Sequence, residues 1–149
     1  MTWSETFGPE LQTKGGLKST DDLLAGKKYV GLYFSAHWCP PCRAFTPMLS
    51  ETYETFIGDG HKDFALIFVS SDRDEAAFDE YYGEMPFYAL PYAKRDEKDA
   101  LAKKFEIRGI PTLVFVNAAG ELLTKDGRQV VSNARGDPDR VLAALAEAK

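Results

Sequence analysis

The chain has 149 residues, two of them cysteines, and 18 basic against 23 acidic side chains give it a formal net charge of −5 at pH 7. Its length suits one domain. Two cysteines can form only one disulfide bridge, which excludes a disulfide-rich scaffold. The excess of acidic side chains argues against a nucleic-acid surface. No run reaches the roughly 20 apolar residues of a membrane span, and the first residues lack a signal-peptide pattern. We therefore expect one domain over residues 1–149, in the cytoplasm or the nucleus, with no membrane or nucleic-acid partner.

The first half of the chain predicts a hairpin, two buried strands and one long helix. Glycine and proline breakers mark a short N-terminal β-hairpin between Phe7 and Thr20. Two apolar runs that do not alternate, Tyr29–Ala36 and Phe64–Ser70, predict strands that are buried on both faces. Between them, apolar residues recur with a helical period from Pro40 to Ile57, which indicates a helix.

The second half predicts a further alternation of helices and strands. Strands joined by helices favour parallel pairing, whereas the turn at Ala119-Gly120 is too short for a crossover and requires an antiparallel pair. The pattern predicts a three-layer α/β domain, with a central mixed β-sheet and helices on both faces. The elements expected in this half are helices at Asp72–Tyr82 and Asp96–Phe105, strands at Thr112–Asn117 and Glu121–Thr124, and a helix from Pro138 to about Ala148 with Asp137 as its N-cap.

Both cysteines lie in the sequence Trp38-Cys39-Pro40-Pro41-Cys42, where the first buried strand gives way to the long helix. Cysteines at this spacing in a first helical turn have Cα atoms about 5–6 Å apart, within disulfide range. The unpaired N–H groups and the dipole of the helix N-terminus favour a thiolate at Cys39. Because prolines lack an N–H, the amide of Cys42 is the expected local donor to the Cys39 sulfur.

This placement predicts thiol–disulfide exchange, in which Cys39 attacks a substrate disulfide and Cys42 then resolves the mixed disulfide. A zinc site is one alternative, but zinc takes three or four protein ligands, and only His37 and His61 remain besides carboxylates. A chance pair of buried structural cysteines is another alternative. We expect no metal and no tightly bound organic cofactor, with electrons supplied by another thiol system.

A second feature lies about 70 residues further along, where Gly109-Ile110-Pro111-Thr112 opens a strand. A proline at a strand entrance can be cis, and the backbone of Ile110 would then be presented to a bound peptide. Together with the residues around the cysteines, this segment predicts a docking surface for substrates. The surface consists of Trp38, Pro40, Pro41, Ile110 and Pro111.

The string from Gly31 to Pro47, with WCPPC at its centre, and the later Ile-Pro-Thr resemble the thioredoxin superfamily, and within it the nucleoredoxin and tryparedoxin branch. The likeness extends roughly from Phe7 to Asp137. It implies a thioredoxin-like fold and a monomeric protein-disulfide reductase. It also implies partners: protein disulfides, peroxiredoxin-type proteins among them, as substrates, and thioredoxin reductase, glutathione or a related thiol as electron donor. Nucleoredoxins are also reported to regulate signalling proteins, so a redox-sensitive interaction module is the alternative function.

The sequence departs from general thioredoxins at one position. Those proteins carry a buried aspartate six residues before the first cysteine, and Tyr33 stands at that position here. Proton handling for Cys42 is therefore expected from the Tyr33 hydroxyl, from Asp72 or from water. Asp72 lies between a strand and a helix, so its simpler expected role is that of an N-cap.

Overall fold

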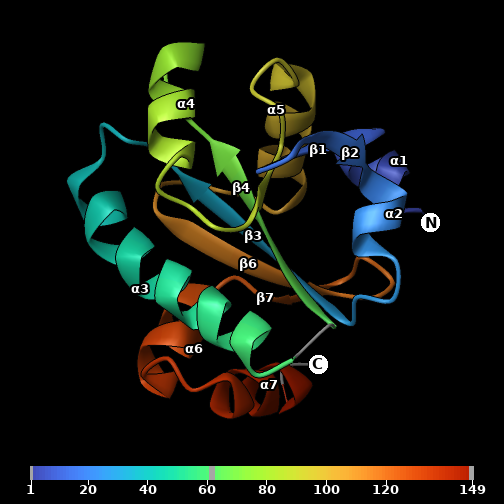
Figure 1. Ribbon diagram of the computed structural model, residues 1–149, viewed down its shortest axis with the longest axis vertical. Helices are drawn as coiled ribbons and strands as arrows, with labels where there is room; N and C mark the ends of the chain where they lie inside the picture. The colour runs from blue at the N-terminus through green and yellow to red at the C-terminus, as the bar shows by residue number, and fades with distance from the viewer. Residues whose placement is uncertain (1, 61–62, 148–149) are drawn as a thin grey trace.

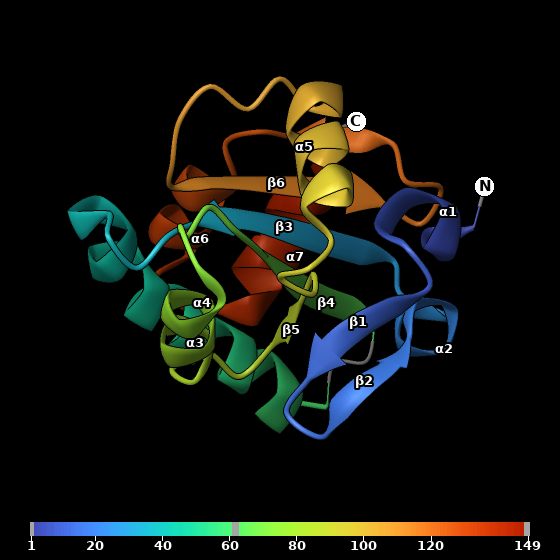
Figure 2. The same cartoon turned by 90° about the horizontal axis from the view of Figure 1, so that it is seen from above.

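The computed structural model describes residues 2–60 and 63–147, which form one seven-stranded sheet with helices on both of its faces (Figures 1 and 2). The strand order across the sheet is β2-β1-β5-β4-β3-β6-β7. The strands are β1 (Glu10–Thr13), β2 (Gly16–Ser19), β3 (Tyr29–Ser35), β4 (Phe64–Ser70), β5 (Tyr88–Ala89), β6 (Thr112–Asn117) and β7 (Leu122–Thr124). The helices are α1 (Trp3–Phe7), α2 (Thr20–Leu24), α3 (Pro40–Gly58), α4 (Glu75–Tyr82), α5 (Arg95–Lys104), α6 (Gly127–Ala134) and α7 (Pro138–Glu147).

Two hydrophobic layers hold the helices to the sheet. Helices α3, α4, α6 and α7 pack on one face, against side chains such as Tyr33, Phe68 and Phe115. Helices α1, α2 and α5 pack on the opposite face, where Leu32 and Ile67 belong to the second cluster. Because both faces are covered, every residue of β3 and β4 is buried, which explains why these runs do not alternate. The predicted three-layer α/β architecture is confirmed.

Strand directions agree with the sequence prediction except at β6. Helix α3 carries the chain from β3 to β4, and these strands pair in parallel from Tyr29↔Phe64 to Ser35↔Ser70. Strands β6 and β7 are antiparallel, as the short turn requires. The parallel pairing expected for strands joined by helices is wrong for β6, which runs antiparallel to β3. The segment after α5 returns the chain to the C-terminal end of β3. Strand β6 therefore begins there, and Thr112 pairs opposite Phe34.

The N-terminal hairpin is confirmed and joins the main sheet, because Gln12 of β1 pairs with Ala89 of β5. The helix predicted from Asp72 begins at Glu75, and its N-cap is Asp74, whose carboxylate accepts the N–H of Ala77. The N-cap role weighed for Asp72 is therefore wrong. The short elements α1, α2, α6 and β5 were not predicted.

The last helix starts at Pro138 as expected, and the Asp137 carboxylate accepts the N–H of Asp139 at 3.0 Å. Its predicted end at Ala148 lies outside the described residues. None of the helices within residues 2–60 and 63–147 is both long enough and apolar enough to cross a membrane.

A substitution at Gly31 in β3 tests how tightly the hydrophobic layer between the sheet and helices α3, α4, α6 and α7 is packed. We call this the first hydrophobic layer. A Cβ at this position would lie 2.5 Å from Leu66 Cδ2 and 2.9 Å from Phe115 Cε1. We expect Gly31→Ala to lower the free energy of unfolding by about 1–3 kcal/mol, because the neighbours must shift in a close-packed layer. Urea denaturation measures this. Gly58→Ala is the matched control, since its Cβ meets no atom within 4 Å, and equal midpoints for the two variants would contradict the packing argument.

Candidate active site

The two cysteines lie at the junction of β3 and α3. Cys39 is the N-cap of α3, and the N–H of Cys42 donates to its Sγ at 3.4 Å. The carbonyl oxygen of Ile110 lies 3.9 Å from the same sulfur. Cys39 is 4% exposed, whereas Cys42 is fully buried one turn into the helix. The predicted local donor is thus present, and Cys39 is the more exposed of the two cysteines. We call the surface around Cys39, which includes Trp38, Pro40, Pro41 and Ile110, the rim.

The residues predicted for docking come together around Cys39. Trp38 is 50% exposed, and its Nε1 donates to the carbonyl of Ser71 at 3.1 Å. The guanidinium of Arg73 lies over the Trp38 ring, 5.4 Å from its centre. Trp38 and Ile110 both line a shallow cleft of about 270 Å³.

Of the remaining docking residues, Pro40 and Pro41 lie at this rim, whereas Pro111 is buried. Pro40 and Pro41 are exposed in the first turn of α3. The peptide bond between Ile110 and Pro111 is cis, as its position at a strand entrance suggested. Ile110 packs against the small cluster that holds both cysteines. The rim therefore offers an aromatic wall and a backbone carbonyl next to the Cys39 sulfur.

The Cys42 thiol lies in a poorly solvated site. Burial raises the pKa of Cys42 to about 11, and its hydrogen bond with Cys39 acts in the same direction. Hydrogen bonds with the Ser35 hydroxyl and the Ala36 backbone oppose this shift. Cys42 is consequently a thiol at neutral pH, and only a small fraction is present as the nucleophilic thiolate.

Tyr33 lies beneath Cys42, where its hydroxyl donates to the Cys42 carbonyl at 3.2 Å and bonds Thr46 Oγ1 at 2.7 Å. Burial raises the pKa of this phenol, so it stays neutral. The hydroxyls of Ser35 and Tyr81 belong to the same cluster, since they bond each other at 2.9 Å. Sequence reasoning missed Ser35, Thr46 and Tyr81. The available signals were a serine that ends an apolar strand and a threonine one turn after Cys42.

Asp72 holds the loop that leads to Cys39. Its buried carboxylate accepts the N–H of His37 at 2.7 Å and the hydroxyl of Ser70 at 2.6 Å. The His37 ring stacks on Tyr81 with 5.1 Å between ring centres. Within the described residues, no hydrogen bond joins Asp72 to Cys42. The structure thus brings Tyr33 beneath Cys42 but uses Asp72 as an anchor for the backbone.

The geometry gives little basis for the zinc alternative. In the described part of the chain, no three His, Cys, Asp or Glu residues gather closely enough to hold a metal ion. His61, one of the two histidines considered as a ligand, lies outside the described residues. Cys39 and Cys42 alone supply two of the three or four protein ligands that zinc takes.

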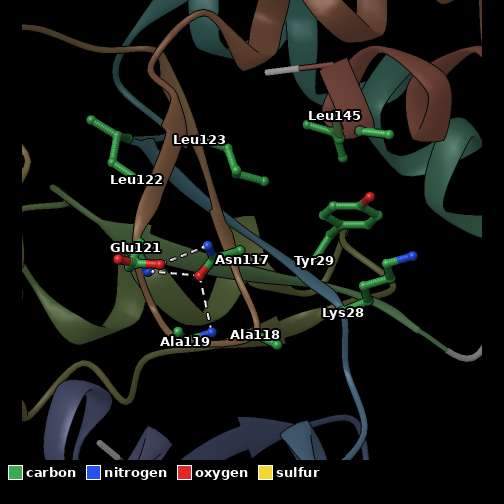
Figure 3. A pocket seen from close by; sticks show the side chains of 10 residues that line it. Lys28, Tyr29, Asn117, Ala118, Ala119, Glu121, Leu122, Leu123 and Leu145 are labelled. Atoms are coloured by element: carbon green, nitrogen blue, oxygen red, sulfur yellow. Dashed lines mark hydrogen bonds between the residues drawn. The ribbon is translucent and has the colours of Figure 1, made fainter. Parts of the chain in front are cut away.

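A larger hollow of about 660 Å³ lies at the other end of the sheet (Figure 3). Its walls come from the start of β3 at Tyr29, the turn between β6 and β7, and Leu145 of α7. Hydrogen bonds between Asn117 and Glu121 shape the turn. The side chains that line this hollow include no cysteine, histidine or hydroxyl nucleophile other than the Tyr29 phenol. The groups suited to thiol chemistry thus gather at the opposite end of β3.

Two substitutions separate the anchoring role of Asp72 from a proton-carrying role. Asp72→Asn keeps an oxygen that accepts the His37 N–H, whereas Asp72→Ala leaves that donor unpaired. We expect Asp72→Ala to lower the free energy of unfolding by about 1–3 kcal/mol, and Asp72→Asn to retain most of the reactivity of Cys39 toward a disulfide. Urea unfolding and thiol-reactivity assays measure the two effects. Loss of reactivity in a stable Asp72→Asn variant would instead assign proton transfer to this carboxyl.

Comparisons with known proteins agree with this geometry. A family model described as thioredoxin-like matches residues 26–122. The chain is 42% identical to nucleoredoxin of Danio rerio over 132 residues, which cover 89% of this chain and 30% of that protein. It is 49% identical to probable nucleoredoxin 1 of Arabidopsis thaliana over 118 residues, covering 79% of this chain and 20% of that protein. The chain thus spans less than a third of these longer relatives.

Other relatives match over most of their own length. Tryparedoxin of Trypanosoma brucei brucei is 42% identical over 130 residues, covering 87% of this chain and 85% of that protein. The solved structure of tryparedoxin II from C. fasciculata superposes with a TM-score of 0.82 at 36% identity, covering 92% of this chain and 89% of that one. On this fold and this sequence similarity, the chain belongs to the thioredoxin-like family, in the branch of nucleoredoxins and tryparedoxins.

Proposed function

We propose that this domain is a protein thiol–disulfide oxidoreductase that reduces protein disulfides through Cys39 and Cys42. The observation that carries the proposal is the geometry of the first turn of α3. There the Cys42 N–H donates to the Cys39 sulfur at 3.4 Å, while Cys42 itself lies fully buried behind Cys39. A helix N-terminus and a local N–H donor both stabilise a thiolate, which is the attacking species in disulfide exchange.

The reaction proceeds in two balanced exchanges. The Cys39 thiolate attacks one sulfur of the substrate disulfide, a mixed disulfide forms, and the other substrate sulfur leaves as a thiolate that takes up a proton. Cys42 then loses its proton and attacks the Cys39 sulfur, which releases the second substrate thiol. Two electrons pass to the substrate, and the domain is left with a Cys39–Cys42 disulfide. Two thiol groups of a donor must return these electrons before the next turnover, and they are themselves oxidised to a disulfide.

The rim around Cys39 supports a peptide as the substrate. The Ile110 carbonyl near the Cys39 sulfur can accept an N–H from an extended substrate backbone, and the exposed face of Trp38 can cover its side chains. Disulfide-bearing proteins such as peroxiredoxins fit this description. We place this reaction in the cytoplasm or the nucleus and expect the domain to act as a monomer.

Regeneration requires a thiol donor, for which we propose thioredoxin reductase, glutathione or a related thiol. One solved relative, tryparedoxin II, was crystallised in complex with glutathionylspermidine. That complex favours a donor of the glutathione class for this domain as well.

A redox-sensitive interaction module of the nucleoredoxin type is the second candidate. Burial raises the pKa of Cys42 to about 11, which keeps the thiolate fraction low and slows the resolving step. A mixed disulfide with a partner would then persist, as a regulatory complex requires. Turnover distinguishes this candidate from the reductase.

Serine variants of the two cysteines test the proposal. We expect Cys39→Ser to lose catalysis of insulin reduction by dithiothreitol, because no nucleophile remains at the rim. Cys42→Ser should capture substrates as mixed disulfides on Cys39, because the resolving thiol is absent. Absorbance assays and non-reducing gels of a lysate of the source cell, followed by mass spectrometry, measure the two outcomes.

Two results would count against the proposed reductase. If Cys39→Ser catalyses insulin reduction as fast as the unmodified domain, the proposed function is wrong. A partner that stays bound to the Cys42→Ser variant under reducing conditions, together with absent turnover, would favour the interaction module.

A further inference from the structure

Four buried hydroxyl groups form a continuous line of hydrogen bonds beneath Cys42. Ser35 Oγ bonds the Tyr81 hydroxyl at 2.9 Å, and the Tyr81 hydroxyl bonds Thr46 Oγ1 at 2.5 Å. Thr46 Oγ1 in turn bonds the Tyr33 hydroxyl at 2.7 Å. All four side chains are buried. We call this set, Ser35, Tyr81, Thr46 and Tyr33, the hydroxyl chain.

The hydroxyl chain meets Cys42 at both of its ends. At one end, the Ser35 hydroxyl lies near the Cys42 thiol and acts to lower the pKa of that thiol. At the other end, the carbonyl oxygen of Cys42 accepts hydrogen bonds from Thr46 at 2.8 Å and from Tyr33 at 3.2 Å. The four members come from β3, α3 and α4, so the tertiary fold brings them together.

Each hydroxyl carries one proton, and this restricts how the chain can be ordered. With Cys42 as a thiol, the S–H would donate to Ser35, Ser35 to Tyr81, and Tyr81 to Thr46, whose hydroxyl donates to the Cys42 carbonyl. With Cys42 as a thiolate, the order would reverse: Tyr33 would donate to Thr46, Thr46 to Tyr81, Tyr81 to Ser35, and Ser35 to the sulfur. Every hydroxyl proton is therefore used in either state.

We propose that the hydroxyl chain stabilises the Cys42 thiolate while it attacks the mixed disulfide, in place of a charged side chain. The inference rests on the proposed function, since it concerns the resolving step of that reaction. In this step Cys42 gives up a proton, and its sulfur bonds the Cys39 sulfur. The bond from Cys39 to the substrate breaks, and the substrate leaves as a thiol. Aligned hydroxyl dipoles strengthen one another in a poorly solvated site, and they add no buried charge when Cys42 is protonated.

Few charged groups compete with the hydroxyl chain. Cys39 faces Cys42 across the first turn of α3 and is covalently engaged in the mixed disulfide. The His37 ring stacks on Tyr81 and pairs with Glu84 at 3.7 Å, and Asp72 is occupied by the His37 backbone. From the segment before β6, the apolar Ile110 packs against the cluster that holds both cysteines.

The test follows the resolving step as a function of pH. Reduced protein is mixed rapidly with an aromatic disulfide whose thiol product is coloured, so the second equivalent of colour reports attack by Cys42. We expect Ser35→Ala to move the midpoint of the rate upward by about one pH unit and to slow resolution about tenfold below it, as loss of a charge-assisted hydrogen bond implies. Tyr81→Phe should slow it about threefold, because Ser35 then lacks its donor.

Two control variants remove similar groups outside the hydroxyl chain. Ser50→Ala deletes a buried hydroxyl in α3 that has no hydrogen-bond partner among residues 2–60 and 63–147. Tyr82→Phe deletes a buried phenol next to Tyr81 that donates to the Phe87 carbonyl instead. Both should keep the pH profile of the unmodified domain, and Ser35→Thr, which retains the hydroxyl, should restore it. A purely structural effect of Ser35→Ala would change stability without moving the midpoint.

The outcomes decide the inference separately from the proposed function. Midpoints of Ser35→Ala and Tyr81→Phe that coincide with those of the controls would overturn it. A shift in Ser35→Ala alone would also overturn the chain and leave a single hydroxyl contact. If the unmodified domain releases no second equivalent of colour, the proposed function fails instead. The Cys42 ionisation is then read directly by NMR titration of cysteine labelled with carbon-13, and the same comparison of variants applies.

Discussion

The antiparallel register between β3 and β6 is the constraint on which the site depends. It sets Thr112 opposite Phe34 at the C-terminal end of β3, where the chain turns toward α3. Ile110 and Pro111 immediately precede Thr112, so the register alone places them beside Cys39. A slip of one residue would reverse the faces of every side chain in β6 and remove Leu113 and Phe115 from the first hydrophobic layer. The burial of β6 on both faces therefore fixes the geometry of the rim as well as the core.

The groups that surround the poorly solvated Cys42 thiol are neutral hydroxyls rather than charged side chains. In the proposed reaction Cys42 must lie behind Cys39 to resolve a mixed disulfide, and that position buries Cys42 completely. A buried charge nearby would require its own partner, whereas hydroxyls can be buried at low cost when each is hydrogen-bonded. The aromatic residues around them, such as Tyr33 and Phe45 in edge contact at 5.8 Å, fill the remaining space. The same residues thus serve the packing of the layer and the chemistry at its rim.

Local patterns in the sequence predicted the parts of the structure that local physics determines. The non-alternating runs located β3 and β4, the helical period located α3, and the spacing of Cys39 and Cys42 predicted their shared first turn. The direction of β6 could not be predicted, because it depends on how α5 packs and where the following segment returns. Nor could the meeting of Ser35, Thr46 and Tyr81, since they lie on three separate elements. Asp72 looked like an N-cap in sequence because its true partner, the His37 backbone, is 35 positions away.

If Cys42 resolves mixed disulfides as proposed, its burial makes the residence time of a covalent partner depend on pH. A partner attached to Cys39 would leave when Cys42 loses its proton, and below the raised pKa each rise of one pH unit multiplies the thiolate population by about ten. A partner captured at mildly acidic pH would therefore stay attached far longer than one captured at mildly alkaline pH. The acidity of a compartment, as well as its supply of thiols, would then set how long such complexes last.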